Sequence, residues 1–197
     1  MSTDFLLQQL YSIENAKRVN RERVANIVSE QPELMEPLVE ITFRVDDKIS
    51  IKAAWILEWV CIHVCIERII PYLDSFTENL KSLKFDSSIR PCSKICESLA
   101  TNYTSSKNNS VKEFLQETHI ENLIETGFDW LITPQKIAVR AYTMNTLYLL
   151  GTLPRKEWVH PELENLIRTK IIHEGKGCKA RGRHILEQIE KFKKSHS

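Results

Sequence analysis

The sequence predicts an all-α protein, a right-handed α–α superhelix (solenoid) of four to five helical pairs, and three observations support this. The chain of 197 residues has only 5 Gly and 7 Pro, too few turn-forming residues for an all-β sandwich or barrel. Its apolar residues recur with the spacing of a helix face. A pattern of two helices returns about every 39 residues, and because neither helix can bury its apolar face alone, neighbouring pairs must stack.

Prolines mark the first helix of three of these pairs. Pro32, Pro71 and Pro161 each precede an apolar helical run, and a proline in the first helical turn needs no partner for its missing N–H. The apolar run from 119 to 132 opens another pair. Pro37 lies deeper in its helix, where we expect it to cause a kink.

The second helix of each pair carries a basic residue among small or apolar residues, at Lys52, Arg90, Arg140 and Lys179. The longest interval lies between Arg90 and Arg140, which predicts a polar insertion over residues 104–118. Asp46 and Asp47 precede the helix of Lys52, and Asp86 precedes that of Arg90. These turn acids are expected to accept backbone N–H groups where the second helix begins. Pro91 then falls in the first turn of its helix.

One pair carries most of a known repeat pattern: Leu34, Leu38, Ile41, Asp46, Asp47, Ile51, Lys52, Ala53, Ala54, Leu57 and Val60. This pattern resembles a HEAT repeat, and the resemblance covers roughly residues 15–190. It implies an armadillo-type fold, with residues 1–197 forming a single HEAT-like domain that ends in a basic helix, 178–195. In such arrays the basic residue usually pairs with a turn acid of its own or the next pair. Two later turns depart from the pattern because they lack the aspartate.

The whole chain also resembles small bacterial proteins that are sometimes labelled adenylosuccinate lyase. The lyase superfamily has a flexible, glycine-containing loop with the sequence Ser-Ser-x-Met-Pro. The nearest string here, Ser87 to Pro91, has the serines and the proline without the methionine. A helix start explains the same residues, so lyase chemistry is the least favoured function.

Charge and cysteine content indicate a cytoplasmic protein. The net charge of +1 gives no general attraction to nucleic acid or membrane, although residues 176–197 hold seven Lys or Arg against two Glu. The first residues lack the basic start and continuous apolar run of a signal peptide, and no segment resembles a membrane span. Five cysteines, an odd number, do not suggest a disulfide framework.

Local motifs for catalysis or for a cofactor are absent from the sequence. Cys61 and Cys65, like Cys92 and Cys96, are four residues apart on a helix face and could bind a metal, but the two pairs differ in register along the repeats, so packing is favoured. His119 and His160 stand at helix starts and are expected to cap them. We therefore predict no catalytic residue, no cofactor and no metal ligand.

The sequence favours a non-catalytic scaffold that binds a protein or acidic peptide on the concave face formed by the second helices. The predicted binding residues are Lys52, Trp55, Arg90, Lys94, Arg140, Tyr142, Lys179 and Arg183. Two alternatives remain for these residues: the cations pair with turn acids, or the aromatic rings belong to the core. A further alternative is nucleic-acid binding, including a glycosylase-like HEAT protein that uses Glu58 or Glu97 beside Trp55.

Overall fold

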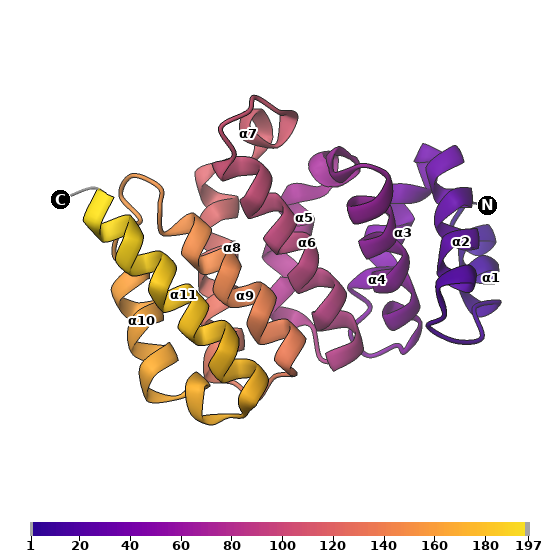
Figure 1. The fold of residues 1–197 in the computed structure, drawn as a ribbon. Helices are drawn as coiled ribbons and strands as arrows, with labels where there is room; N and C mark the ends of the chain where they lie inside the picture. The colour runs from indigo at the N-terminus through magenta and orange to yellow at the C-terminus, as the bar shows by residue number, and fades with distance from the viewer. Residues whose placement is uncertain (1, 196–197) are drawn as a thin grey trace. The chain divides into compact units, whose positions relative to one another are not determined.

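The all-α class is confirmed. The computed structural model describes residues 2–195, and within them the chain forms eleven α-helices with five shorter helical segments and no strand (Figure 1). None of these helices combines the length and the apolar character needed to cross a membrane.

The chain, expected to be one domain, divides into two compact units. The first unit runs up to Ser98 and the second begins at Leu99, so the division falls inside one helix, α6 (Asp86–Thr104), rather than in a loop.

The first unit is built from stacked helical pairs. Its elements are α1 (Ser2–Tyr11), α2 (Arg18–Glu30), α3 (Met35–Thr42), α4 (Ile49–Trp59), α5 (Leu73–Asn79) and the first part of α6. Helix α3 packs against α4, while α1 lies on α3 and α2 on α4. The first helices of neighbouring pairs therefore contact each other, and so do the second helices. Fully buried Leu6, Leu38 and Leu57 contribute to this core.

The turn acid before α4 acts as predicted. Asp47 accepts a hydrogen bond from the Ile49 N–H at 3.0 Å, which satisfies one of the unpaired donors at the helix start. The predicted kink at Pro37 is wrong. A 3₁₀ turn, Pro32–Leu34, precedes α3, and since α3 begins at Met35, Pro37 lies in its first turn.

Helix α4 ends in an irregular segment that reaches the next pair. It continues as a π-helical turn, Val60–Val64, and Cys65 then adopts an extended conformation with φ −165°. A 3₁₀ segment, Ile66–Tyr72, contains Pro71 and leads directly into α5.

Pro91 lies deeper in α6 than predicted, because the helix already begins at Asp86. A proline has no N–H, so the carbonyl oxygen four residues earlier, that of Ser87, loses its partner within the helix. The indole Nε1–H of Trp55 donates to this oxygen at 3.2 Å. The proline in α6 thus creates the acceptor that holds the side chain of Trp55 on α4.

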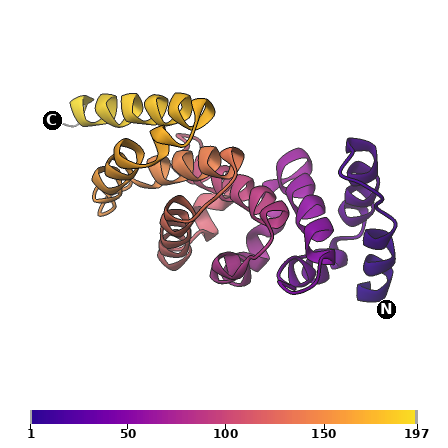
Figure 2. The same cartoon turned by 90° about the horizontal axis from the view of Figure 1, so that it is seen from below.

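The second unit repeats the pairwise packing. Its elements after α6 are α7 (Ser110–Phe114), α8 (Glu117–Ile132), α9 (Ile137–Leu150), α10 (Val159–Thr169) and α11 (Lys176–Ser195). Helix α8 packs on α9 and α10 on α11, while α11 lies beside α9 and α10 beside α8 (Figure 2). The short α7 falls within the predicted insertion, and α11 is the predicted basic helix, begun two residues earlier.

Two histidines secure helix ends in this unit. His119 Nδ1 accepts the Gln116 N–H at 3.0 Å and so caps α8 as predicted. His160 lies at the start of α10, but its Nε2 is 2.9 Å from the carbonyl oxygen of Tyr148, in the last turn of α9. It therefore pairs with a carbonyl oxygen at the end of the preceding helix instead of capping its own helix. Gly151 makes room, since a Cβ there would stand 2.4 Å from the His160 ring.

Candidate anion-binding site

The first unit places one buried carboxylate among three cations. Glu58 is on α4, and its side chain is only 5% exposed. Lys94 Nζ lies 3.2 Å from its Oε1, while Arg90 Nη1 and Arg21 Nη1 lie 3.4 and 3.9 Å from its Oε2. We call these four residues the Glu58 cluster. Because α2, α4 and α6 each contribute to it, the cluster depends on the stacking of three helical pairs.

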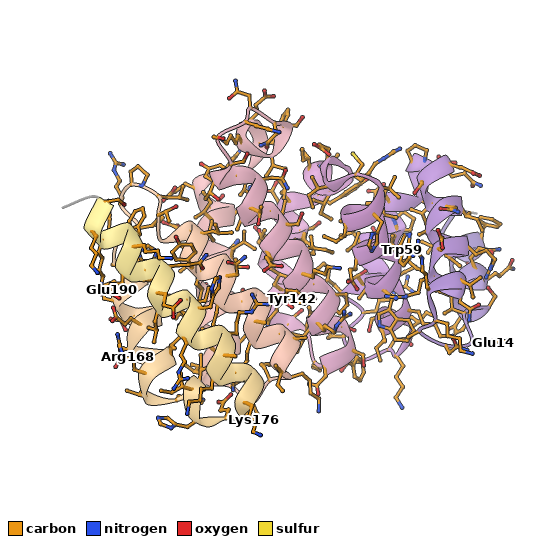
Figure 3. The ribbon with its side chains drawn as sticks, viewed as in Figure 1. Glu14, Trp59, Tyr142, Arg168, Lys176 and Glu190 are labelled. Atoms are coloured by element: carbon orange, nitrogen blue, oxygen red, sulfur yellow. The ribbon has the colours of Figure 1, made fainter. Side chains whose placement is uncertain are left out.

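Trp59 extends the cluster toward α2. The guanidinium carbons of Arg18 and Arg21 lie 5.5 and 5.4 Å from the centroid of its ring, within the range of a cation–π contact. Figure 3 labels Trp59 at its place in the first unit. Trp59 itself is buried, with 7% of its surface exposed. The ring thus orients the two arginines and offers little surface of its own.

The Glu58 cluster contains two more positive charges than negative ones. The side chains of Arg90, Lys94 and Arg21 remain 43%, 26% and 22% exposed, whereas that of Glu58 is buried. Arg18, at the edge, pairs with Glu22 at 3.4 Å. Partly exposed cations that outnumber their internal counter-charge attract an anion, and a guanidinium also donates in a geometry that fits a carboxylate or a phosphate.

Of the predicted binding residues in the first unit, Trp55, Arg90 and Lys94 come together where α4 meets α6. Lys52, one turn before Trp55 on α4, donates from Nζ to the carbonyl oxygen of Tyr11 at 3.3 Å. Trp55 and Lys52 are half-buried, and each side chain donates a hydrogen bond to a backbone carbonyl oxygen.

In the second unit Arg140 is a structural residue. It is 2% exposed, donates to the carbonyl oxygens of Leu131 and Thr133 at 2.8 and 3.1 Å, and pairs with Glu174. Glu174 stands in the turn before the next second helix, α11, so this is the pairing with a turn acid that the repeat pattern implies. A buried guanidinium that is held by two carbonyl oxygens and a carboxylate does not contact a partner, so Arg140 is unsuited to the binding role expected for it.

The other three predicted residues of the second unit remain accessible to different degrees. Tyr142 is half-buried on α9, while Lys179 and Arg183 are exposed on α11, one helical turn apart.

From the sequence, Glu58 was predicted only as a carboxylate of a glycosylase-like protein, and one cation of the site was missed. Arg21 was not predicted, although Arg18 and Arg21 are three residues apart and so share a face of α2. Arg23, on the same helix, donates instead to the side chains of Gln9 and Ser12. Glu58 carried a signal, because it is the only acid in the apolar run 53–64.

The cysteines near the cluster are packing residues. Burial raises the pKa of Cys61, Cys92 and Cys96, and Cys92 lies close enough to Cys61 to raise its pKa further. The two cysteine pairs are thus nearer than their repeat positions suggested, but the thiols stay protonated at neutral pH. Within residues 2–195 no three His, Cys, Asp or Glu side chains gather in a way that could hold a metal ion.

Comparison with protein-family models, with curated proteins and with solved structures gave no match to this chain.

Proposed function

We propose that the protein is a non-catalytic binding scaffold, and that its first unit binds an acidic segment of a protein or peptide through the Glu58 cluster. The observation that carries this proposal is the convergence of Arg21, Arg90 and Lys94 on a single buried carboxylate. The unbalanced positive charge provides the attraction, and the exposed parts of Arg90 and Lys94 provide the contacts.

The surroundings of the cluster favour carboxylates over nucleic-acid bases. Single-stranded nucleic acid is bound largely by stacking bases on open aromatic faces. Here Trp59 is buried beneath two arginines, and Trp55 is fixed by its hydrogen bond to Ser87. Charge-assisted hydrogen bonds from guanidinium groups to carboxylates need no such face.

Two catalytic alternatives have little support. A glycosylase-like mechanism would need a carboxylate that faces an open pocket, whereas three cations surround the buried oxygens of Glu58. The string from Ser87 to Pro91, which is similar to the flexible loop of the lyases, lies within α6.

The pairwise packing in each unit supports the finer part of the proposal, a HEAT-like, armadillo-type repeat arrangement. In the first unit α2 lies on α4, and in the second α9 lies on α11, so second helices contact second helices. Repeated along the chain, contacts between second helices would place them together on the concave face of a right-handed superhelix.

The test is a titration with a fluorescent peptide rich in Asp and Glu, at low and at moderate salt. We expect salt-dependent binding. It should weaken at least tenfold in the Arg90→Gln/Lys94→Gln variant, because the two side chains that contact the anion lose their charge. The matched control is Lys48→Gln/Lys81→Gln, which removes the same charge from exposed positions of the first unit and should leave affinity unchanged. No salt-dependent binding, or an equal loss in both variants, would reject the proposal.

A second candidate, nucleic-acid binding, is favoured by α11. Lys176, Lys179, Arg181 and Arg183 are all exposed in its first half. Duplex DNA in the same titration separates the two functions: if DNA binds with a steep salt dependence and the acidic peptide does not, the second candidate replaces the first.

A further inference from the structure

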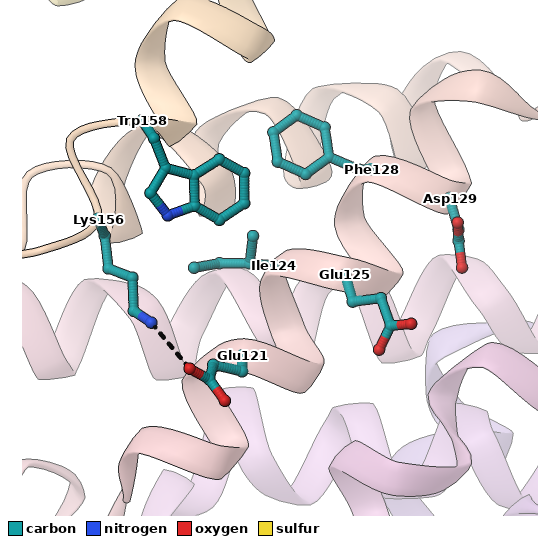
Figure 4. Close-up of a pocket in the computed structure, with 7 residues that line it drawn as sticks. All are labelled: Glu121, Ile124, Glu125, Phe128, Asp129, Lys156 and Trp158. Atoms are coloured by element: carbon teal, nitrogen blue, oxygen red, sulfur yellow. Dashed lines mark hydrogen bonds and ion pairs between the residues drawn. The ribbon is translucent and has the colours of Figure 1, made fainter.

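A pocket of about 470 Å³ opens in the second unit beside α8 (Figure 4). Its lining comes from α8 and from the residues just before α10: Glu121, Ile124, Glu125, Phe128, Asp129, Lys156 and Trp158. The three acids follow one another at intervals of four residues, so they form a row along one face of α8. We call this site the α8 pocket.

One wall of the α8 pocket is a pair of stacked aromatic rings. The ring centroids of Trp158 and Phe128 lie 5.9 Å apart with an interplanar angle of 24°. Trp158 is nonetheless 52% exposed, an unusual degree for the largest apolar side chain. The stack holds the indole in place and leaves a wide aromatic face beside Ile124, as Figure 4 shows.

The opposite side of the pocket is negatively charged. Its only cation, Lys156, is 7% exposed, and its Nζ lies 2.5 Å from Glu117 and 3.2 Å from Glu121. Glu125 and Asp129 are exposed and form no ion pair with any residue between positions 2 and 195. The pocket therefore has two exposed carboxylates without an ion-pair partner among residues 2–195.

We propose that the α8 pocket binds the side chain of an arginine from a basic peptide segment. The apolar stem of that arginine would lie along Ile124 and the face of Trp158, and its guanidinium would reach past Phe128 to donate to Glu125 and Asp129 (Figure 4). A guanidinium fits because its planar fork can donate to both carboxylates at once. An ammonium group is a compact point charge that bridges two carboxylates less well.

The inference goes beyond the proposed function, because the two sites select opposite charges. The Glu58 cluster attracts an anion in the first unit, whereas the α8 pocket attracts a cation in the second. Each can fail without the other.

The test follows the ¹⁵N–¹H resonance of the Trp158 indole, assigned with Trp158→Phe, during titration with a blocked tripeptide Gly-Arg-Gly. We expect a saturable shift, and binding at least tenfold weaker for the same peptide with citrulline, which has the shape of arginine without its charge. The Glu125→Gln/Asp129→Asn variant should weaken arginine binding by a similar factor.

The matched control is Glu162→Gln/Glu187→Gln, which removes two exposed acids elsewhere in the second unit and should bind as the unchanged protein does. Circular dichroism confirms that each variant is folded. The proposal is overturned by equal binding of the citrulline peptide, by an unaffected Glu125→Gln/Asp129→Asn variant, or by no saturable shift. It is also overturned if the linear polyamine spermidine binds more tightly than the arginine peptide, since the ligand would then be a polyamine.

Discussion

At the scale of single residues, identical positions in the repeat pattern serve different purposes. Arg90 and Arg140 occupy the same place in their helical pairs, yet the side chain of Arg90 is 43% exposed above Glu58 and that of Arg140 is 2% exposed. The sequence predicts both cations, but their exposure depends on Glu58 and Glu174, which come from distant segments. The local pattern therefore locates basic residues without distinguishing a binding role from a structural one.

Arg140→Lys should lower the free energy of unfolding by about 2 kcal/mol, because an ammonium cannot reach two carbonyl oxygens and a carboxylate together. Urea denaturation followed by circular dichroism measures the change. Arg183→Lys, on the exposed face of α11, is the control and should stay within about 0.5 kcal/mol of the unchanged protein. A loss no larger for Arg140 than for Arg183 would contradict the structural role.

At the scale of helices, the sequence was most informative about where elements begin. Aspartate acts through backbone chemistry within a few residues, so the start of α4 beside Asp47 could be predicted. The π-helical turn Val60–Val64 could not, since it depends on how α4 packs against neighbours. The link from Pro91 to Trp55 could not be predicted either. It runs through the hydrogen bond from Trp55 to the Ser87 carbonyl oxygen, and these two residues are 32 positions apart.

That link predicts an energetic coupling between Trp55 and Pro91, which do not hydrogen-bond to each other. Trp55→Phe removes the indole donor to the Ser87 carbonyl oxygen, which lacks its helical partner because residue 91 is proline. In the Pro91→Ala background, the N–H at position 91 supplies a replacement. A double-mutant cycle in urea should give a coupling of about 1 kcal/mol. Strictly additive effects would show that the freed carbonyl does not need the indole.

At the scale of the whole molecule, the helical class follows from composition and periodicity, which average over many residues. The division at Ser98 and Leu99 had no such signal, because it lies inside the continuous helix α6. Cytoplasmic location, the repeat family and the partner stay predictions. The α8 pocket was also missed, although Glu121, Glu125 and Asp129 have the spacing of one helix face, a pattern visible in the sequence.

Global stability should decrease as the pH falls from 7 to 5. Burial lowers the pKa of His160 below its ordinary value of 6.5, so the unfolded chain takes up the proton first. The stabilisation is complete above that value and is lost as the pH falls toward the pKa in the folded protein. The stabilisation from Glu164, whose pKa is lowered by its hydrogen bond with Lys193, is complete above the ordinary value of 4.5 and is lost only below it, so it does not change between pH 7 and pH 5.

Melting temperatures between pH 7 and pH 5 test this expectation. The decline should be smaller in His160→Gln, whose amide can still donate to the Tyr148 carbonyl but does not titrate. His184→Gln, at an exposed position of α11, should retain the decline of the unchanged protein. Parallel curves for the two variants would assign the pH dependence to other groups.

Alkylation of the buried thiols can measure how often the first unit opens locally. Cys61, Cys92 and Cys96 are buried, and their pKa values are raised by that burial. An alkylating reagent attacks only an accessible thiolate, so each of these sulfurs waits for a local opening before it reacts. The alkylation rate at each site would therefore report how often α4 and α6 separate. A ligand that holds these helices together at the neighbouring Glu58 cluster would lower that rate.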